Sequence, residues 1–325
     1  MRAMPRNRRR KEQPAKPPKH TDPTKTPTSE AIERVMRIYS AEGYRKRTMH
    51  DYRRYIADLT EHAGLTYIDD LTTDHIHTYV SDLLERMSAT TVNIRLSSIR
   101  AVINKMCGAG IIDHNPVKEV HKVKEDDKLP KILSKGQVQR FFAAIDVSTW
   151  IGFRDYCMCG LAYRSGLRGD EIERIDIADI DFDNDVILLP GAKNKNRKVR
   201  PVPLSRKIKP DLLQLVAETR GFFGDEVKRL FVTQFGQPVG KGLFRSRMYR
   251  YAEMAGITKE TQCSPHVLRH TFAVNFLSSP YGNVRALQLI LGHSHLSTTE
   301  IYLDFLNDTV IDQYHKVETS EYFDV

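Results

Sequence analysis

Apolar residues recur at helical spacing in four successive stretches between residues 28 and 112. Residues three and four positions apart share one face of an α-helix, so each stretch predicts an amphipathic helix with one buried side. Short helices of this kind are stable mainly through packing against one another. The pattern therefore predicts a small independent bundle of four helices over residues 28–115. Its clearest apolar stripe consists of Ile76, Tyr79, Val80, Leu83, Leu84 and Met87.

Polar residues and glycines predict where some of these helices begin and end. Thr28 stands directly before the first stripe, and Thr48 is followed by Asp51 at a spacing that resembles a capping box. Side-chain oxygens at such positions accept hydrogen bonds from the unpaired N–H groups of the first turn. We therefore expect Thr28 to cap the first helix and Thr48 the second. Gly108 and Gly110 should end the fourth helix.

Two segments lack this periodicity. Residues 1–27 are rich in Arg, Lys, Pro and Thr and nearly free of apolar residues, which predicts a disordered basic arm. The arm could grip phosphates or be a solvated tail, and both interpretations stay open. Residues 116–131 are mostly charged and contain Pro130 near their end. This composition predicts a linker between two domains.

Helical spacing returns in a second predicted domain over residues 132–308. Ser134 and Gln137 have the spacing of a capping box, which predicts the start of a helix. Ser264 before Pro265 is a strong start signal for another helix, because serine caps well and proline fits the first helical position.

Strand and turn signals occupy the middle of this domain. Asp183-Asn184 predicts a turn, residues 186–189 form a β-rich run, and Val202 continues the pattern after a basic segment. These features predict a small strand-turn-strand unit, to which residues 229–232 could add a short strand. The fold class predicted for the whole chain is mainly α with a small β-sheet: a helical bundle followed by an α+β domain.

Two further helices are predicted near the end of the second domain. Gly292 should end one of them, and Ser297 can cap the next, which carries Tyr302. Residues 309–325 form an acidic tail with a short apolar helical face. That face consists of Val310, Ile311 and Tyr314.

Composition narrows the classes of function. The formal net charge is +9, which favours a polyanionic partner but also suits an ordinary soluble protein. The chain lacks the run of about 18 apolar residues that a membrane span needs, so no membrane partner is expected. Its cysteine spacing does not fit a zinc site, and free thiols predict a reducing compartment such as the cytoplasm. The cysteines are Cys107, Cys157, Cys159 and Cys263.

Four sequence elements could supply the groups that break a phosphodiester. The reaction needs a nucleophile, cations for the non-bridging oxygens and a proton donor for the leaving oxygen. Arginine suits the oxygens because its guanidinium group binds them through two N–H groups. His266 and Arg269 lie three residues apart and so share a helix face. The other elements are Gly166-Leu167-Arg168, Leu291-Gly292-His293 and Tyr302.

The order and spacing of these elements resemble the tyrosine recombinase (phage integrase) family over residues 132–308. In that family a Gly-Leu-Arg segment supplies a first arginine with an acidic residue three positions later, here Arg168 and Glu171. A His-x-x-Arg box supplies a second pair. A Leu-Gly-His element supplies another ring, and the tyrosine nucleophile follows nine residues later. The resemblance implies a catalytic set of Arg168, His266, Arg269, His293 and Tyr302, together with a lysine.

The family lysine lies in a β-turn, five residues before an arginine that leads into an apolar-Pro-apolar run. Lys195 fits this pattern, since Arg200 and Val202-Pro203-Leu204 follow it. Lys193 is the alternative in the same crowded turn. Two neighbouring positions where the family often has glycine differ here, and that leaves the choice open.

The resemblance also implies how the reacting groups would act. Arg168 and Arg269 would hold the non-bridging oxygens, and His293 would donate a hydrogen bond to the phosphate. Tyr302 would attack the phosphorus and form a 3′-phosphotyrosine. Lys195 would protonate the departing 5′ oxygen.

Three further residues would support this chemistry. His266 would assist proton transfer near the tyrosine, because an imidazole titrates close to neutral pH. Glu171 and His270 would orient the arginine and its helix. No cofactor and no metal are implied, since the phosphotyrosine bond retains the energy of the phosphodiester.

The same resemblance implies that the N-terminal bundle is the family's SAM-like core-binding domain, which closes the other side of the DNA. Arg95, Arg100 and Lys105 lie on the polar side of its fourth helix, where they could contact DNA or form an ordinary solvated face. The implied partner is double-stranded DNA carrying recombination sites, bound by a homotetramer on paired sites. Accessory DNA-bending proteins could assist, and the acidic tail could contact a neighbouring subunit. The expected location is the cytoplasm, at the nucleoid.

Three functions remain in view. The favoured one is a site-specific recombinase or integrase that acts through a Holliday junction for a mobile element or phage. A type IB topoisomerase would share the chemistry without the sequence specificity. A non-catalytic DNA-binding protein would keep the fold, but all the catalytic positions are filled here.

Overall fold

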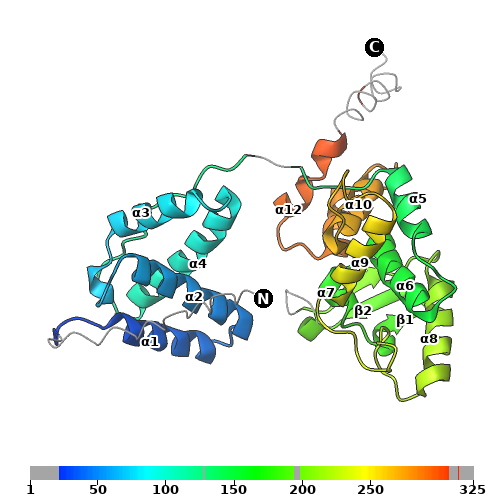
Figure 1. Cartoon of the computed structure of the whole chain (residues 1–325), viewed down its shortest axis with the longest axis horizontal. Helices are drawn as coiled ribbons and strands as arrows, with labels where there is room; N and C mark the ends of the chain where they lie inside the picture. The colour runs from blue at the N-terminus through cyan, green and yellow to red at the C-terminus, as the bar shows by residue number, and fades with distance from the viewer. Residues whose placement is uncertain (1–21, 127–128, 194–197, 307–313, 315–325) are drawn as a thin grey trace, which may run out of the picture. The chain divides into compact units, whose positions relative to one another are not determined.

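The computed structural model describes residues 22–126, 129–193, 198–306 and 314. The chain divides between residues 127 and 128 into two compact units (Figure 1). Both units are dominated by helices, and a small sheet belongs to the second. The predicted fold class, mainly α with a small β-sheet, is confirmed. None of the helices in the described ranges combines the length and apolar character that crossing a membrane requires.

The first unit is the predicted bundle of four helices. Helix α4 packs against the other three, and their apolar stripes form one core. Ile76, Tyr79 and Leu83 of the third stripe are buried in it, whereas Leu84 is exposed. The helices are α1 (Thr28–Ala41), α2 (Lys46–His62), α3 (Thr73–Leu84) and α4 (Ala89–Gly108), with a short 3-10 helix at Ile68–Asp70.

The helix starts predicted at Thr28 and Thr48 are wrong. Pro27 takes the capping position of α1, and Thr28, the first helical residue, donates its hydroxyl to carbonyl oxygens of the loop after α2. Helix α2 begins at Lys46 with Arg45 in the capping position, three residues earlier than expected, so Thr48 lies within its first turn and caps nothing. Asp51 accepts instead from Arg47 Nε at 3.1 Å.

Part of the predicted linker packs onto this bundle. Val117 and Val120 are buried in its core, and Asn93 Nδ2 donates to the carbonyl oxygen of Val123 at 2.8 Å. The valines of this segment are few and stand among charged residues, so their burial was not predicted. The division between the two units therefore falls well after Pro116.

The second unit surrounds a buried helix. Helix α6 contacts α8, α9 and α10, and it is apolar on most sides because it is enclosed. The helices are α5 (Lys135–Ala143), α6 (Trp150–Ser165), α7 (Gly169–Ile172), α8 (Lys209–Phe223), α9 (Leu243–Met254), α10 (Pro265–Leu277), α11 (Val284–Leu291) and α12 (Ser297–Glu300). Short 3-10 helices lie at Ile177–Asp179, Gly191–Lys193 and Leu303–Leu306.

The sheet of this unit is antiparallel, with the order β1-β2-β3. Its strands are β1 (Ile180–Asp181), β2 (Val186–Leu189) and β3 (Arg200–Pro203). Ile187 faces Ile180 on one side and Val202 on the other, which confirms the predicted strand-turn-strand unit. The strand considered for residues 229–232 does not form, since Arg229 and Val232 make only isolated bridges.

Predicted helix ends in the second unit have mixed outcomes. Ser134 and Gln137 form the predicted capping box, and Gly292 ends α11 with a positive φ of 64°. Helix α10 begins at Pro265 as predicted, but the Ser264 side chain makes no capping bond. Helix α12 ends at Glu300, so Tyr302 follows the helix instead of lying on it.

A buried ionic network fixes α6 inside this unit. The Asp155 carboxylate accepts from Arg154 Nη2 at 2.7 Å, from Arg247 Nε at 2.5 Å and from the Tyr251 hydroxyl at 2.7 Å. Arg247 and Tyr251 belong to α9, so one carboxylate joins two helices. Asp155 is almost fully buried, and its loss would leave cationic groups without compensation in a poorly solvated place.

We expect Asp155→Asn to destabilise the second unit by about 3–5 kcal/mol, the usual effect of breaking a buried charge pair. Trp150 is the only tryptophan of the chain and lies at the start of α6. Urea denaturation followed by its fluorescence therefore reports unfolding of this unit. Glu260→Gln, which breaks an exposed ion pair with Arg140, should leave the denaturation midpoint close to that of the wild type. Equal losses in the two variants would contradict a central role for Asp155.

Candidate active site

The site begins where α6 ends. Gly166 follows the helix with a positive φ of 64°, a conformation that glycine adopts without strain. A Cβ atom at this position would lie 2.5 Å from Cδ1 of Phe272, so the close approach of α10 also requires glycine. The chain then turns through Leu167 and presents Arg168 at the start of α7.

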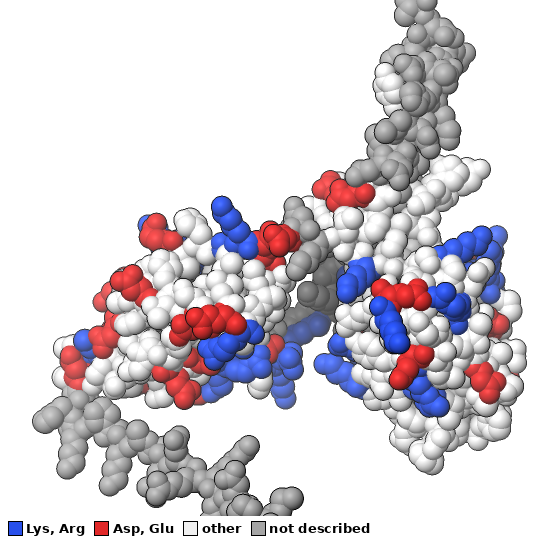
Figure 2. Space-filling model, turned by 45° about the horizontal axis from the view of Figure 1, so that its top comes forward, with Lys and Arg blue, Asp and Glu red and all other residues white. Residues whose placement is uncertain are grey.

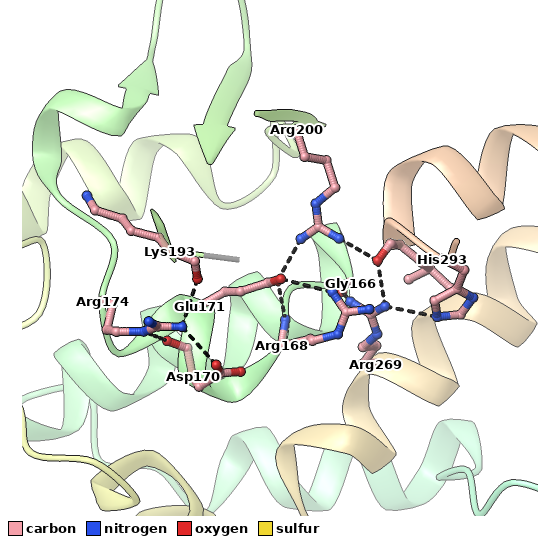
Figure 3. Close-up of polar contacts among 10 residues, drawn as sticks. Gly166, Arg168, Asp170, Glu171, Arg174, Lys193, Arg200, Arg269 and His293 are labelled. Atoms are coloured by element: carbon pink, nitrogen blue, oxygen red, sulfur yellow. Dashed lines mark hydrogen bonds and ion pairs between the residues drawn. The ribbon is translucent and has the colours of Figure 1, made fainter. Parts of the chain in front are cut away.

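The carboxylate of Glu171 is the centre of the site. It accepts hydrogen bonds from Arg168 N at 2.9 Å, Arg168 Nη1 at 2.9 Å and Arg200 Nη2 at 2.6 Å (Figure 3). Only 1% of Glu171 is exposed. Burial alone would raise the pKa of Glu171, but Arg200, Arg168 and Arg269 outweigh it and lower the pKa. Glu171 is therefore an anion that holds two guanidinium groups in place.

Arg269 lies beside this carboxylate but is bonded to neutral groups. Its Nη1 donates to the carbonyl oxygen of Gly166 at 2.6 Å, and its Nη2 donates to that of Leu291 at 2.7 Å. Nη2 also lies 3.1 Å from His293 Nε2. Burial and the neighbouring Arg168 lower the pKa of Arg269, yet a guanidinium group keeps its proton at neutral pH. Its charge is thus available to an incoming anion.

His293 is brought to Arg269 by the turn at Gly292 after α11. Its Nδ1 lies 2.9 Å from Thr299 Oγ1, and burial together with Arg269 lowers the pKa of His293 to about 3. The ring is therefore neutral at pH 7. In this arrangement Nε2 accepts from Arg269 and Nδ1 donates to Thr299. The expected hydrogen bond from His293 to a phosphate would need the other tautomer.

Two cavities adjoin these groups within the second unit. One has a volume of about 620 Å³ and is lined by Arg168, Arg200 and His293 among others. The other, of about 490 Å³, is lined by Asp170, Arg245 and His266 among others. The structure therefore brings Arg168 and His293 to one cavity, with Arg269 buried directly beside His293, while His266 borders the second cavity.

Tyr302 is close to these groups but does not face either cavity. Only 1% of it is exposed, and it packs in an apolar cluster with α10 and α11. Its hydroxyl lies 2.7 Å from His270 Nδ1. Burial raises the pKa of Tyr302, and Arg269 and Arg168 partly oppose that effect. The phenol is accordingly a protonated, sheltered group in this state.

The structure changes the roles expected of the two histidines on α10. His270, expected to orient the arginine, contacts the Tyr302 hydroxyl instead. His266, expected near the tyrosine, is one ring further away, with its centroid 6.3 Å from that of His270. The two residues are four positions apart, so sequence spacing could not tell which of them faces Tyr302. Burial lowers the pKa of His270 to about 4, with His266 and Arg269 adding to the effect.

The two lysine candidates have different outcomes. Lys195 lies outside the described residues. Lys193 is paired with Asp176 and Asp179 at 2.5 Å each, and its side chain points away from Arg168 (Figure 3). Lys193 is thus engaged elsewhere in this structure.

Arg200 is the site residue that the sequence did not identify as such. The sequence analysis used Arg200 only to locate the family lysine five residues before it. In the structure, its side chain donates hydrogen bonds to Glu171 and to the carbonyl oxygen of Leu291. One signal was present: Arg200 precedes Val202 by two residues on the same strand, which puts a charged residue on the buried face. A buried arginine requires a partner, and Glu171 was a candidate.

Basic residues considered for DNA contact in the first unit are paired within it. Arg95 Nη1 lies 2.7 Å from Asp58 Oδ2, and Lys105 Nζ lies 2.7 Å from Glu42 Oε1. Arg100 donates to the carbonyl oxygen of Val120. On the face shown in Figure 2, acidic and basic side chains lie close together over both units. These contacts favour the interpretation of α4 as an ordinary charged face.

Comparison with known proteins gives matches for both units. Residues 131–308 match the phage integrase family, and residues 31–113 match the N-terminal SAM-like domain of phage integrases. The chain is 31% identical over 219 residues to tyrosine recombinase XerC of Chlamydia caviae, covering 67% of this chain and 68% of that protein. It is 30% identical over 283 residues to tyrosine recombinase XerD of Xanthomonas axonopodis pv. citri, covering 83% and 91%.

Solved structures share the fold at lower identity. The XerH site-specific recombinase bound to palindromic difH substrate has a TM-score of 0.69 and 16% identity, covering 90% of this chain and 97% of that chain. The Tn1549 transposon integrase in complex with circular intermediate DNA has a TM-score of 0.65 and 23% identity, covering 84% and 94%.

We expect the second unit to lose stability between pH 7 and pH 5, with His270 responsible for part of the loss. The pKa of His270 is about 4 in the folded chain against an ordinary value of 6.5, so the unfolded chain binds the proton first as the pH falls. The stabilisation is complete above about pH 6.5 and is lost toward pH 4, by up to about 1.4 kcal/mol per pH unit.

Urea denaturation followed by Trp150 fluorescence at both pH values measures this loss. It should be smaller in His270→Gln than in the wild type, whereas the exposed control His295→Gln should behave like the wild type. The same pH sensitivity in His270→Gln and wild type would contradict a neutral, buried His270.

Proposed function

This chain belongs to the phage integrase family of site-specific tyrosine recombinases, enzymes that cleave and rejoin DNA, and we propose that Tyr302 is its nucleophile. The observation that carries this proposal is the arrangement around Glu171. Arg168 and Arg269 flank one buried carboxylate, His293 lies 3.1 Å from Arg269, and the Tyr302 hydroxyl is held by a neighbouring histidine on α10. Two fixed guanidinium groups beside an open cavity suit a phosphate anion.

The proposed cleavage step gives a role to each of these groups and to Lys195. Arg168 and Arg269 bind the non-bridging oxygens of the scissile phosphate. The Tyr302 oxygen attacks phosphorus, its proton passes to His270 or His266, and the bond from phosphorus to the 5′ oxygen breaks. Lys195 gives a proton to that oxygen, so a 5′-hydroxyl leaves and a 3′-phosphotyrosine remains.

Rejoining is the reverse reaction with a different 5′-hydroxyl. That hydroxyl attacks the phosphotyrosine, Tyr302 leaves and recovers a proton, and a phosphodiester is restored. Two such exchanges on paired sites pass through a Holliday junction. Because each step exchanges one phosphate ester for another, the free energy of the bond is conserved and no nucleotide triphosphate is consumed.

Tyr302 has to move before it can react. Its hydroxyl is buried against His270 and borders neither cavity. DNA bound beside Arg168 and Arg269 neutralises part of their charge, and repacking of the segment after α12 would then expose the phenol to the phosphate. The short α12 and the turn that follows it are the elements that have to shift.

The two units would divide the work. The first, residues 28–115, matches the SAM-like domain and would act as the core-binding domain that holds the far side of the DNA. The segment 116–131 would join the two domains, and the catalytic domain, residues 132–308, would cleave the DNA. The basic arm 1–27 and the tail 309–325, including Val310, Ile311 and Tyr314, would add DNA or subunit contacts.

The partner is DNA, and the assembly is part of the proposal. A homotetramer on paired recombination sites would place four tyrosines on four strands, with accessory DNA-bending proteins as an option. The XerC and XerD relatives support site-specific recombination, and a role for a mobile element or phage is a further part of the proposal. Action on DNA would take place in the cytoplasm, at the nucleoid.

Covalent trapping tests the nucleophile. On a nicked suicide substrate carrying the recombination site, the wild type should form a protein–DNA adduct that survives a denaturing gel, because the short fragment with the released 5′-hydroxyl diffuses away before it can rejoin. Tyr302→Phe should lower adduct formation to background while binding the same DNA within about threefold, since it lacks only the attacking oxygen. Tyr281→Phe, which alters an exposed tyrosine of the same unit, is the control. An adduct that persists in Tyr302→Phe would rule out this assignment.

A further inference from the structure

We propose that Arg200 is a positioning residue of the strand-cleavage reaction, which fixes Arg168 and Arg269 relative to one another before DNA binds. The inference rests on the proposed function and deepens it. Arg200 is the first residue of β3, whereas Arg168 directly precedes α7 and Arg269 lies on α10. Arg200 reaches both halves of the site at once from its place at the start of β3.

The first half of the site is held through Glu171. Arg200 Nη2 lies 2.6 Å from Glu171 Oε2, and the same oxygen accepts from Arg168 N at 2.9 Å. The other carboxylate oxygen accepts from Arg168 Nη1. The orientation of the Arg168 guanidinium group therefore depends on the position of Glu171, and Arg200 helps to set that position.

The second half is held through Leu291. Arg200 Nη1 donates to the carbonyl oxygen of Leu291, and Arg269 Nη2 donates to the same oxygen. This carbonyl ends α11, directly before the glycine turn that carries His293. One guanidinium group thus joins the carboxylate that holds Arg168 to the carbonyl that holds Arg269 (Figure 3).

The glycine turn is shaped to admit Arg200. A Cβ atom on Gly292 would collide with Arg200 Nη1 and would lie 2.6 Å from its Cδ. Gly292 also has a positive φ of 64°. The residue between Leu291 and His293 therefore has two reasons to be glycine, its backbone conformation and the arginine that lies across it.

Arg200 borders the cavity of about 620 Å³, but its hydrogen-bonding atoms are turned inward, which suits support more than contact with phosphate. Only 8% of it is exposed, both of its Nη atoms are bonded inward, and its buried Nε has no hydrogen-bond partner among the described residues. Leaving a buried donor without a partner costs stability. The two hydrogen bonds from the Nη atoms offset this cost and link Glu171 to Leu291.

Arg200 also prevents Glu171 from competing with the substrate. Without it, the buried carboxylate would keep its negative charge with Arg168 as its remaining direct side-chain partner. Arg168 would then be drawn toward Glu171, and a phosphate entering the cavity would meet a nearby unbalanced anion. The expected result is slower chemistry with nearly normal DNA affinity, because most DNA contacts lie elsewhere.

Substitution by lysine separates charge from geometry. Arg200→Lys keeps a cation beside Glu171, but a single ammonium group cannot reproduce the planar fork that reaches two acceptors. Arg200→Met removes both. The matched control is Arg206→Met. Arg206 is an exposed arginine that lies shortly after β3 in the chain and pairs with Asp185.

The test measures single-turnover adduct formation on the suicide substrate at saturating protein, alongside DNA affinity and thermal stability. We expect cleavage to slow by about 10-fold in Arg200→Lys and about 100-fold in Arg200→Met, as for misplaced catalytic groups, with affinity within about threefold of wild type. Arg206→Met should cleave normally. Normal cleavage by a folded Arg200→Lys would overturn the proposal, as would losses that follow weakened binding.

A double-mutant cycle identifies the route of the effect. If Arg200 acts by positioning, Arg200→Met should cost much less in an Arg168→Ala background than in the wild type. Equal costs in the two backgrounds would show that Arg200 acts independently of Arg168, and the proposal would fall. Should Arg200→Met alone not fold, the pair Arg200→Met with Glu171→Gln removes both buried charges and serves as the starting variant.

Failure of the proposed function would look different. In that case the wild type itself forms no adduct. The Arg200 arrangement is then tested by thermal denaturation of Arg200→Met, Glu171→Gln and the double variant. Strong coupling between the two substitutions supports the network, and additive effects overturn it.

Discussion

A single buried carboxylate holds the candidate site together. Glu171 is enclosed by the guanidinium groups of Arg168 and Arg200, and Arg269 lies close enough to lower its pKa as well. Three positive charges and one negative charge leave a local excess of +2. A phosphodiester carries one negative charge, and a second develops as a phenolate attacks it. The site is therefore closer in charge to the transition state than to the bound substrate, which is the difference that accelerates a reaction.

The fixed elements around Glu171 come from ordinary chain chemistry. Gly166 ends α6 and Gly292 ends α11, each with a positive φ, and each turn delivers a functional residue directly after a helix. The buried helix α6 and its Asp155 network give these turns a rigid base. The precision of the site is thus a property of helix ends and of the packed core beneath them.

The sequence was most informative where the deciding interactions are local. Ser134 and its capping box, the turn at Gly292 and the helices themselves follow from neighbouring residues. Interactions between residues far apart in the chain could not be predicted from it. Arg200 meets a carboxylate from a distant helix, and whether His266 or His270 faces Tyr302 depends on how the segment after α12 packs. Thr48 shows a third limit, because moving a helix start by three residues turns a capping residue into an ordinary one.

The burial of Tyr302 has a consequence for the cell that harbours this protein. Chromosomal DNA is present in vast excess over any recombination site, and a permanently exposed nucleophile would nick it at each chance encounter. Tyr302, the proposed nucleophile, is held in an apolar cluster with its hydroxyl beside His270. In that role, its burial would keep chance encounters with chromosomal DNA from leading to cleavage, and exposure of the tyrosine would add a second requirement to the reading of bases.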